Sequence, residues 1–364
     1  MSFVFSERLR TVLAPPRYLA LPLAGIDLST SSVKAVRLAE GSAGLVLAGY
    51  GEARIAAGAF TDGEIVDPVA VVEALTAAAA AAGVSAANVA LSESKSYLFE
   101  LAVAGVGKSE WRTAVEQHLD ELVPLPPAET VFDVAPVGHT GTGDTLVAGI
   151  GFAHRVIDET LDAFDDAGLG IRALEGEMFA AARALLPAGD LSTVLIIDIG
   201  KTATKMAIVA QGIPRFTTTI RIGGHALTLA IQKYFGVTEL EARKVKYERG
   251  IVPTKGNEEY LAAMLSTVSA IRDEIARRLG YWQDRAIPGS THEPVSRAIL
   301  IGGNASMRGF PEYLESALQL PIASGDAFTN FASRDTWIPS LDYTESLAYA
   351  SAIGLALRDH ALYA

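Results

Sequence analysis

The sequence contains no cysteine in its 364 residues. This excludes disulfides, thiolate nucleophiles and cysteine-held zinc or iron–sulfur sites, and it fits a reducing compartment. The six histidines are scattered without ligand spacing, so we expect no zinc site. Basic residues are also few, because 30 Lys and Arg against 42 Asp and Glu give a net charge of -12. Such a chain lacks the clustered positive surface of nucleic-acid binders, and we expect no nucleic-acid partner.

The chain also lacks a stretch typical of a transmembrane helix. The most tempting candidate, residues 71–91, is alanine-rich and is interrupted by Gly83, Ser85 and Asn88. It predicts a helix of a globular domain rather than a membrane span. Half of all residues are hydrophobic, which indicates an ordered protein with a sizeable core.

Residues 1–20 predict an amphipathic N-terminal helix. Phe5 and Leu9 belong to its apolar stripe, three arginines carry its charge, and Pro15 and Pro16 end it. The segment has neither the apolar core nor the cleavage site of a signal peptide. Two interpretations stay open: the helix docks on the protein's own body, or it contacts an anionic membrane surface or a partner.

An internal repeat organises the rest of the chain. The two copies are GIDLSTSSVKAVRL at 25–38 and IDIGKTATKMAIV at 197–209. Asp27 corresponds to Asp198 and Lys34 to Lys205, both at an offset of 171. Each copy predicts a strand that ends on the aspartate, a turn of small and hydroxyl residues, two further strands and then a helix. The repeat indicates two related α/β lobes that face each other.

The segments around the repeat complete the predicted organisation. It comprises an amphipathic helix at 1–20, a first lobe at 21–93 and 171–190 that is rejoined by a C-terminal helix at 342–364, an inserted α+β subdomain at 94–170, and a second lobe at 191–341. Helical periodicity predicts helices at 109–123, 238–250, 257–286, 306–320 and 343–362.

The two aspartate turns are candidate phosphate sites. An aspartate at the end of a strand can hold hydrated Mg2+, while N–H and hydroxyl groups of the turn contact phosphates. One such turn alone is weak evidence, since aspartates commonly cap turns, but two facing copies predict a clamp on a polyphosphate. The candidate residues are Asp27, Ser29, Thr30, Ser31, Ser32 and Lys34 in the first turn, and Asp198, Gly200, Lys201 and Thr202 in the second. Asp27 and Asp198 are the expected magnesium ligands, acting through water.

Paired glycines mark a third candidate turn. An apolar strand enters Gly302 and Gly303, and Asn304 to Met307 are expected to open a helix. Paired glycines let a flat group approach the backbone closely, although a tight strand-to-helix turn needs them as well. A parallel motif, Gly223–Gly224, also enters a predicted helix.

These three turns resemble those of the actin-like ATPase superfamily. Further segments are similar to the PilM family of type IV pilus assembly proteins, and the similarity extends from about Leu23 to Arg358. They are LVPLPPAETVFDVAPV, GLGIRALEGEMFAAARAL, RIGGHALTLAIQKYFGVTELEARKVK, RAILIGGNASMRGFPEYLESAL and SLAYASAIGLALRD. The resemblance implies a bilobed actin-like ATPase fold with duplicated βββαβα lobes and ATP with Mg2+ in the cleft. It implies that Glu241 and Lys244 lie near the ribose and base, and that Glu177 orients the catalytic water.

The resemblance also implies a function that depends on binding more than on catalysis. The chain would be a cytoplasmic scaffold, peripheral to the inner face of the cytoplasmic membrane. It would bind the N-terminal cytoplasmic tail of a PilN-like membrane protein, in a groove between the first lobe and the insertion. Other pilus platform or motor components and self-association are further expected contacts.

Two departures from the family pattern weaken the expectation of ATP hydrolysis more than the expectation of ATP binding. Ser29 stands where the first turn usually has glycine, and Lys201 stands where small residues are usual. The sequence therefore implies at most a slow ATPase.

Two alternative functions stay open. An FtsA-like division or filament protein would carry a C-terminal membrane helix, which the ending LRDHALYA does not resemble. A sugar or acetate kinase would need a general base for its substrate hydroxyl, and no isolated Asp or His fits that role.

Overall fold

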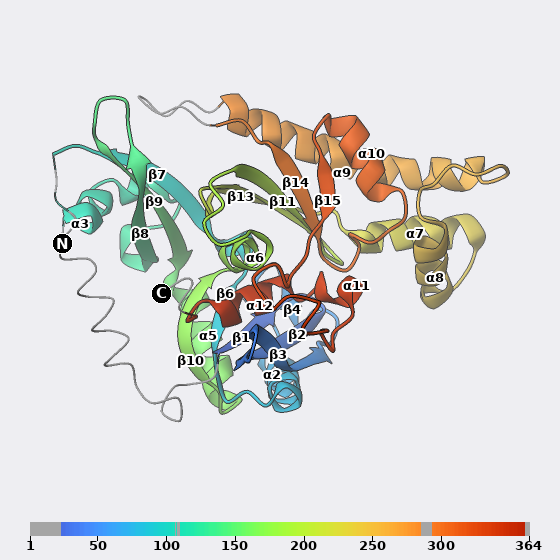
Figure 1. Ribbon diagram of the computed structural model, residues 1–364, viewed down its shortest axis with the longest axis horizontal. Helices are drawn as coiled ribbons and strands as arrows, with labels where there is room; N and C mark the ends of the chain where they lie inside the picture. Colours follow the sequence, from blue (N-terminus) through green and yellow to red (C-terminus); the bar gives the residue numbers. More distant parts are fainter. Residues whose placement is uncertain (1–22, 106, 108–109, 285–292, 361–364) are drawn as a thin grey trace.

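The computed structural model describes residues 23–105, 107, 110–284 and 293–360. The helix predicted for residues 1–20 lies outside this part of the chain. Two five-stranded sheets form the two lobes (Figure 1). The first sheet has the order β10-β6-β1-β2-β3 and the second the order β13-β12-β11-β14-β15. Each is an antiparallel meander of three strands with two parallel strands added to the first of them, so the predicted duplication is confirmed.

The strand bounds follow the two copies of the repeat. The first sheet contains β1 (Leu23–Leu28), β2 (Ser32–Gly41), β3 (Gly44–Arg54), β6 (Ala86–Leu91) and β10 (Gly170–Gly176). The second contains β11 (Thr193–Ile199), β12 (Thr204–Ala210), β13 (Ile213–Ile220), β14 (Arg297–Ile301) and β15 (Ile322–Ser324). The central strands β1 and β11 are apolar on both faces because helices or the other lobe cover both sides.

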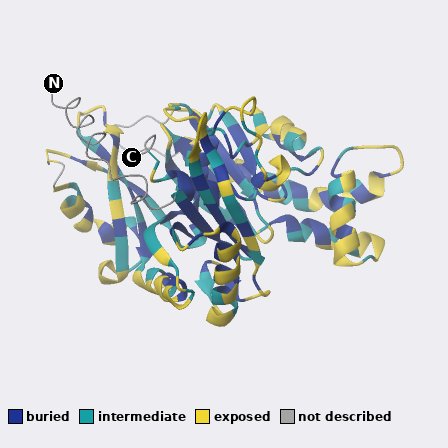
Figure 2. Cartoon of the chain, turned by 60° about the horizontal axis from the view of Figure 1, so that its bottom comes forward, coloured by how far each residue is buried: buried dark blue, intermediate teal, exposed yellow. Residues whose placement is uncertain are grey.

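Two helices cross between the sheets and join the lobes. They are α6 (Glu177–Leu185) and α12 (Ala350–Leu357). One hydrophobic cluster contains side chains from β2, β3, α6, α12 and the second lobe, and Figure 2 shows this buried centre of the molecule. A Cβ on Gly354 would overlap the carbonyl oxygen of Ala180, so this glycine permits the close crossing of the two helices.

The remaining first-lobe elements lie on its outer face and at its edge. Helix α2 (Pro68–Ala82) begins at Asp67, whose side chain accepts a hydrogen bond from the Ala70 N–H, and ends at Gly83 with a φ of 67°. The hairpin of β4 (Phe60–Thr61) and β5 (Glu64–Ile65) precedes it.

The second lobe carries four helices in the described part of the chain. They are α7 (Gly224–Phe235), α8 (Glu239–Arg249), α9 (Glu258–Asp284) and α10 (Phe310–Leu318). The prediction that Asn304 to Met307 open a helix is wrong, because α10 begins at Phe310. Gly302 and Gly309 take φ values of 89° and 78°, so the chain turns through these residues before the helix begins.

The insertion is built on a three-stranded sheet with the order β7-β9-β8. Its elements are η2 (Glu93–Lys95), β7 (Tyr97–Val103), α3 (Trp111–Glu116), α4 (Leu119–Leu122), η4 (Pro127–Glu129), β8 (Thr130–His139), β9 (Thr145–Ala153) and α5 (His154–Asp166). The single helix predicted at 109–123 is two short helices, because the His118 N–H donates to the Val115 carbonyl and closes the first one early. Ala163 and Phe164 of α5 pack in the first-lobe core.

The C-terminal helix predicted from residue 343 is also divided. Helix α11 (Tyr343–Ser346) precedes α12, and the chain turns between them. The Leu347 carbonyl accepts a hydrogen bond from the Gly302 N–H at 3.0 Å instead of continuing the helix. The break therefore ties the C-terminal segment to the third candidate turn. In the described ranges, no helix has the length and apolarity that crossing a membrane requires.

Candidate functional site

A cavity of about 390 Å³ lies between the two lobes. Both aspartate turns and the third turn contribute to its lining. The predicted residues that line it are Asp27, Ser29, Thr30, Ser31, Lys34, Glu177, Asp198, Gly200, Lys201, Thr202, Gly224, Gly302, Gly303 and Asn304. The structure thus brings together residues that are up to about 280 positions apart in the sequence.

The strand register gives both turns the same geometry. Asp27 pairs with Lys34 across β1 and β2, and Asp198 pairs with Lys205 across β11 and β12. The turns approach each other closely, since the hydroxyls of Thr30 and Thr202 lie 3.0 Å apart. An anion in the cavity would therefore meet an aspartate and a lysine from each lobe.

Ser29 does not strain the first turn. Its N–H and its hydroxyl both donate to the Ser32 carbonyl, at 3.0 and 2.8 Å. In the part of the chain that the structure describes, the non-glycine residues with positive φ are Asp62, Gln211 and Gln319, and Ser29 is not among them. The turn keeps its shape without the glycine that the family pattern has there.

A lysine that the site prediction omitted lies among the carboxylates. The Lys205 Nζ is 2.6 Å from Oε2 of Glu177, which is 2% exposed at the N-terminus of α6. Burial lowers the pKa of Lys205, but the nearby carboxylates of Glu177 and Asp198 outweigh it and raise that pKa. Burial in turn raises the pKa of Asp198 and of Glu177, against the opposing effect of Lys205. The arrangement keeps the lysine charged.

Asn304 fastens the third turn to the second. Its amide nitrogen donates to the carbonyls of Ile199 and Gly200, at 3.1 and 2.9 Å. Its amide oxygen accepts from the Lys246 Nζ at 2.7 Å. A Cβ on Gly224 would overlap the Asn304 amide, so glycine is required at this position by packing within the protein.

Lys246 is a structural lysine in the wall of the cavity. Besides Asn304, its Nζ donates to the Gly224 carbonyl at 3.2 Å and to the Thr228 hydroxyl at 3.3 Å. Burial, aided by the nearby Arg243, lowers the pKa of Lys246 to about 8. Three acceptors satisfy its three N–H groups, which leaves none for a ligand.

Helix α8 turns a different face to the cavity than the sequence indicated. Glu241 completes a capping box with Thr238, and Lys244 lies 3.8 Å from Glu248 on the exposed side. The residues that line the cavity are Glu239, Arg243, Lys246 and Tyr247. The positions differ because residues three or four apart share a helix face, and 241 and 244 belong to another face than 239, 243 and 246. The Thr-x-x-Glu motif is itself a helix-start pattern that could have assigned Glu241 to the cap.

Three other predicted residues support the site from behind its surface. Ser32 is buried and accepts a hydrogen bond from the Lys34 Nζ at 2.8 Å. Gly223 precedes α7 and packs on the backbone of Lys201 to Ala203. Met307 belongs to the hydrophobic core and does not line the cavity.

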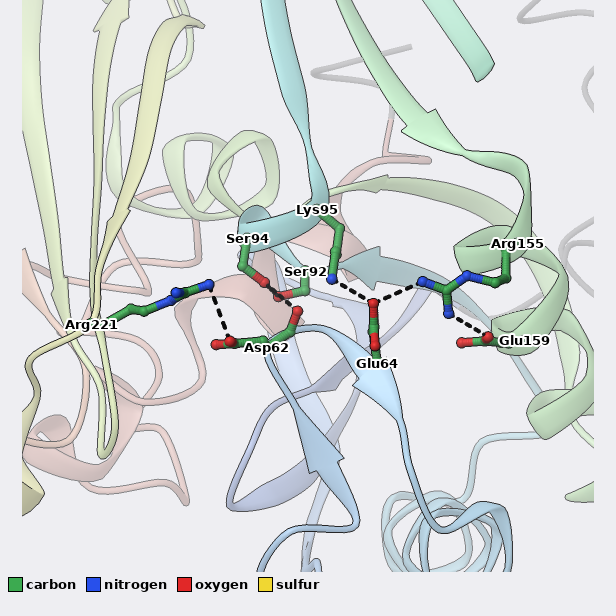
Figure 3. A network of polar contacts seen from close by, with 8 residues as sticks. All are labelled: Asp62, Glu64, Ser92, Ser94, Lys95, Arg155, Glu159 and Arg221. Carbon is green, nitrogen blue, oxygen red and sulfur yellow. Dashed lines mark hydrogen bonds and ion pairs between the residues drawn. The ribbon is translucent and has the colours of Figure 1, made fainter. Parts of the chain in front are cut away.

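The rim of the cavity contains an ion pair between the lobes. Arg221, which follows β13, lies 3.2 Å from the Asp62 carboxylate in the β4–β5 turn (Figure 3). The carbonyl of Asp62 accepts a hydrogen bond from the Ser94 hydroxyl at 2.8 Å. Because Asp62 and Ser94 both line the cavity, this contact connects its mouth to the start of the insertion.

A second group of charges anchors the same hairpin to the insertion. Glu64 Oε1 is 2.6 Å from the Lys95 Nζ and 2.8 Å from a guanidinium nitrogen of Arg155 (Figure 3). Arg155 also holds Glu159 at 2.7 Å. Hydrogen bonds and charge from Lys95, and then from Arg155, lower the pKa of Glu64 to about 2.

The pH dependence of the melting temperature of a Glu64→Gln variant tests this anchor. The lowered pKa means that the ionised carboxylate stabilises the fold fully above the unfolded-state value, which is about 4.3. The stabilisation is lost as pH falls toward 2. We expect the wild type to melt at a higher temperature than the variant at pH 7, and the difference to shrink below about pH 4. A constant difference between pH 7 and pH 3 would contradict this role of the Glu64 charge.

The cavity fits a magnesium-bound polyphosphate. Oδ1 of Asp27 is buried and has no hydrogen-bond partner in the described part of the chain, so it can accept from a metal-bound water. Lys34, Lys201 and Lys205 supply positive charge for phosphates. Over the described ranges, no group of three or more His, Asp or Glu side chains could hold a metal ion directly. Water-mediated contacts from Asp27 and Asp198 are the mode that these residues fit.

Comparisons with known proteins agree with this geometry. The Neisseria meningitidis serogroup B protein named cell division protein FtsA is 25% identical over 212 residues, which cover 52% of this chain. The matched region spans only 50% of that protein's length. A solved PilM-PilN type IV pilus biogenesis complex has a TM-score of 0.75 at 21% identity, covering 92% of this chain and 97% of that one. MreB5 of Spiroplasma citri bound to ADP has a TM-score of 0.55 at 15% identity, covering 94% and 98%.

These likenesses show that the chain shares the fold of the PilM and MreB5 structures, and the predicted bilobed fold is confirmed. The model of one family, described as type IV pilus assembly protein PilM, matches residues 25–360. This match covers the described lobes, the insertion and the cavity between the lobes. The chain therefore belongs to the type IV pilus assembly protein PilM family.

Proposed function

We propose that the chain is an ATP-binding scaffold of the type IV pilus machinery. The observation that carries the proposal is the cavity between two equivalent turns, each with an aspartate and a lysine in register. Membership of the PilM family supplies the cellular context. The nucleotide serves as a ligand that fixes the relation of the two lobes.

The roles of the residues follow from their chemistry. Lys34 and Lys205 neutralise phosphate oxygens from opposite lobes, and the hydroxyls of Thr30 and Thr202 donate hydrogen bonds beside them. Asp27 and Asp198 would hold the water shell of Mg2+, and the ion would supply positive charge to the phosphates.

The third turn, at Gly302–Gly303, suits the nucleoside. Gly303 is open, since a Cβ there would meet no atom within 4 Å, and a flat base can approach its backbone. The Tyr247 hydroxyl donates to the Gly303 carbonyl at 2.8 Å and fixes this surface. Glu239 and Arg243, from the face of α8 that lines the cavity, are the proposed polar contacts in place of Glu241 and Lys244.

Hydrolysis is at most slow in this proposal. Glu177 is the carboxylate that would orient a water. Its Oε2 faces the Lys205 ammonium at 2.6 Å and the Glu93 N–H at 3.3 Å. These two donors occupy both lone-pair sites of Oε2, so this oxygen cannot also accept a hydrogen bond from a water.

The partner in this proposal is the N-terminal cytoplasmic tail of a PilN-like membrane protein. Support comes from the fold shared with the PilM-PilN complex over 92% of this chain. The tail would lie between the first lobe and the insertion, and binding would hold the scaffold at the inner face of the cytoplasmic membrane. Other pilus platform or motor components would dock on the same scaffold, and copies of it would self-associate.

Calorimetric titration tests both parts of the proposal. We expect ATP to bind with a dissociation constant that weakens when EDTA removes Mg2+. We expect a synthetic peptide of a PilN-like cytoplasmic tail to bind the same folded protein, and a scrambled peptide not to bind. Absence of ATP binding would refute the nucleotide role, whereas absence of peptide binding would refute the scaffold role alone.

A further inference from the structure

Lys34 and Lys205 stand at equivalent positions of the repeat, but their side chains have different partners. Lys34 donates to the Ser32 hydroxyl and lies 3.5 Å from Glu52, so both of its contacts are within the first lobe. Lys205 extends from β12 of the second lobe to Glu177 of α6. The second lysine therefore joins β12 of the second lobe to helix α6, which crosses between the sheets.

Lys205 also keeps donors for a ligand. An ammonium group has three N–H donors, and Glu177 takes one of them. Within the described part of the chain, no other side chain or carbonyl accepts a hydrogen bond from its Nζ. Lys246 differs, because its three donors are taken by protein acceptors.

The position of Lys205 relative to the aspartates decides which phosphate it would meet. It is the cross-strand partner of Asp198, and the charge of Asp27 also acts on it. These aspartates would hold Mg2+ through water, and the ion would supply positive charge to the phosphates of a nucleoside triphosphate. With the base at Gly303 and the phosphates beside the aspartates, the terminal phosphate is the group that would reach Lys205.

We propose that Lys205 is the residue that makes the site selective for a nucleoside triphosphate over a diphosphate. This inference rests on the proposed nucleotide function. Two of the lysine's donors contact the terminal phosphate while the third stays on Glu177. The triphosphate is thus linked to α6 through one side chain, and a diphosphate lacks the group that makes this link.

The test measures the affinity of ADP and of a non-hydrolysable ATP analogue, both with Mg2+, by calorimetry. We expect Lys205→Met to weaken binding of the analogue about 10- to 100-fold, which is the contribution of a hydrogen bond to a charged group. Binding of ADP should weaken less than about threefold. Lys205→Met combined with Glu177→Gln should show the same loss of selectivity without leaving an unpaired carboxylate. Lys244→Met, on the exposed face of α8, is the matched lysine control and should keep the wild-type ratio.

The outcomes separate this inference from the proposed function. Wild-type protein that binds neither nucleotide refutes the proposed function. If both nucleotides bind and Lys205→Met weakens them equally, the function stands and the selectivity role is refuted. If the double variant recovers the wild-type ratio, the effect of the single variant came from the unpaired Glu177, and the inference is again overturned.

Discussion

An Asp198→Asn variant should lose the magnesium dependence of ATP binding while keeping its fold. Asparagine preserves the shape of the side chain but removes the charge that would hold the water shell of Mg2+ in the proposed site. Outer-shell contacts to metals are commonly worth about 10- to 100-fold in affinity, and we expect a loss of this size for Mg2+-ATP. Calorimetric titration of ATP, once with Mg2+ and once with EDTA, measures the ATP affinity with and without the ion in one preparation.

The stability of this variant distinguishes a functional carboxylate from a structural one. Burial raises the pKa of Asp198, so its charge is unfavourable in the folded protein without nucleotide added, and neutralising it should leave the melting temperature equal or higher. ATP affinity in EDTA should be equal or stronger, because a repulsive charge is gone. Asp335→Asn, at an exposed position outside the cavity, serves as the control. If ATP binding depends on magnesium equally in Asp198→Asn and in the wild type, the Asp198 carboxylate shapes the turn and does not hold the ion.

The geometry of the two aspartate turns could be predicted because the sequence repeats it. One aspartate turn carries only local information, but the second copy at an offset of 171 indicates that two lobes present the same motif. The antiparallel register then places Lys34 and Lys205 next to the aspartates. The partnership of Lys205 with Glu177 could not be read in the same way, since it depends on how α6 approaches the second lobe.

Which face of helix α8 lines the cavity could not be predicted, for a physical reason. Helix α8 has charged residues on all sides, so its sequence has no apolar stripe that indicates which face is inward. The inward face is set by the buried Ala242 and by Lys246, whose partners come from α7 and the third turn. Glu241 and Lys244 were chosen by resemblance, and the packing turns both away from the cavity.

A second large effect concerns the junction between the insertion and the second lobe. Arg215 of β13 forms an ion pair with Glu100 of β7, and both side chains are buried. The other carboxylate oxygen of Glu100, Oε2, has no hydrogen-bond partner in the described part of the chain. We expect Arg215→Met to lower the free energy of unfolding by about 3–5 kcal/mol, because it leaves a buried charge without its partner.

Urea denaturation with two matched variants separates pairing from packing. Adding Glu100→Leu to Arg215→Met removes both charges and should recover most of the lost stability, since a buried pair can be replaced by apolar side chains at little cost. Arg277→Met breaks the pair between the exposed Arg277 and the partly exposed Glu274, and should cost less than about 1 kcal/mol. If Arg215→Met costs no more than Arg277→Met, the pair does not hold the insertion against the second lobe. A double variant as unstable as Arg215→Met would show that the arginine stem, rather than its charge, stabilises the junction.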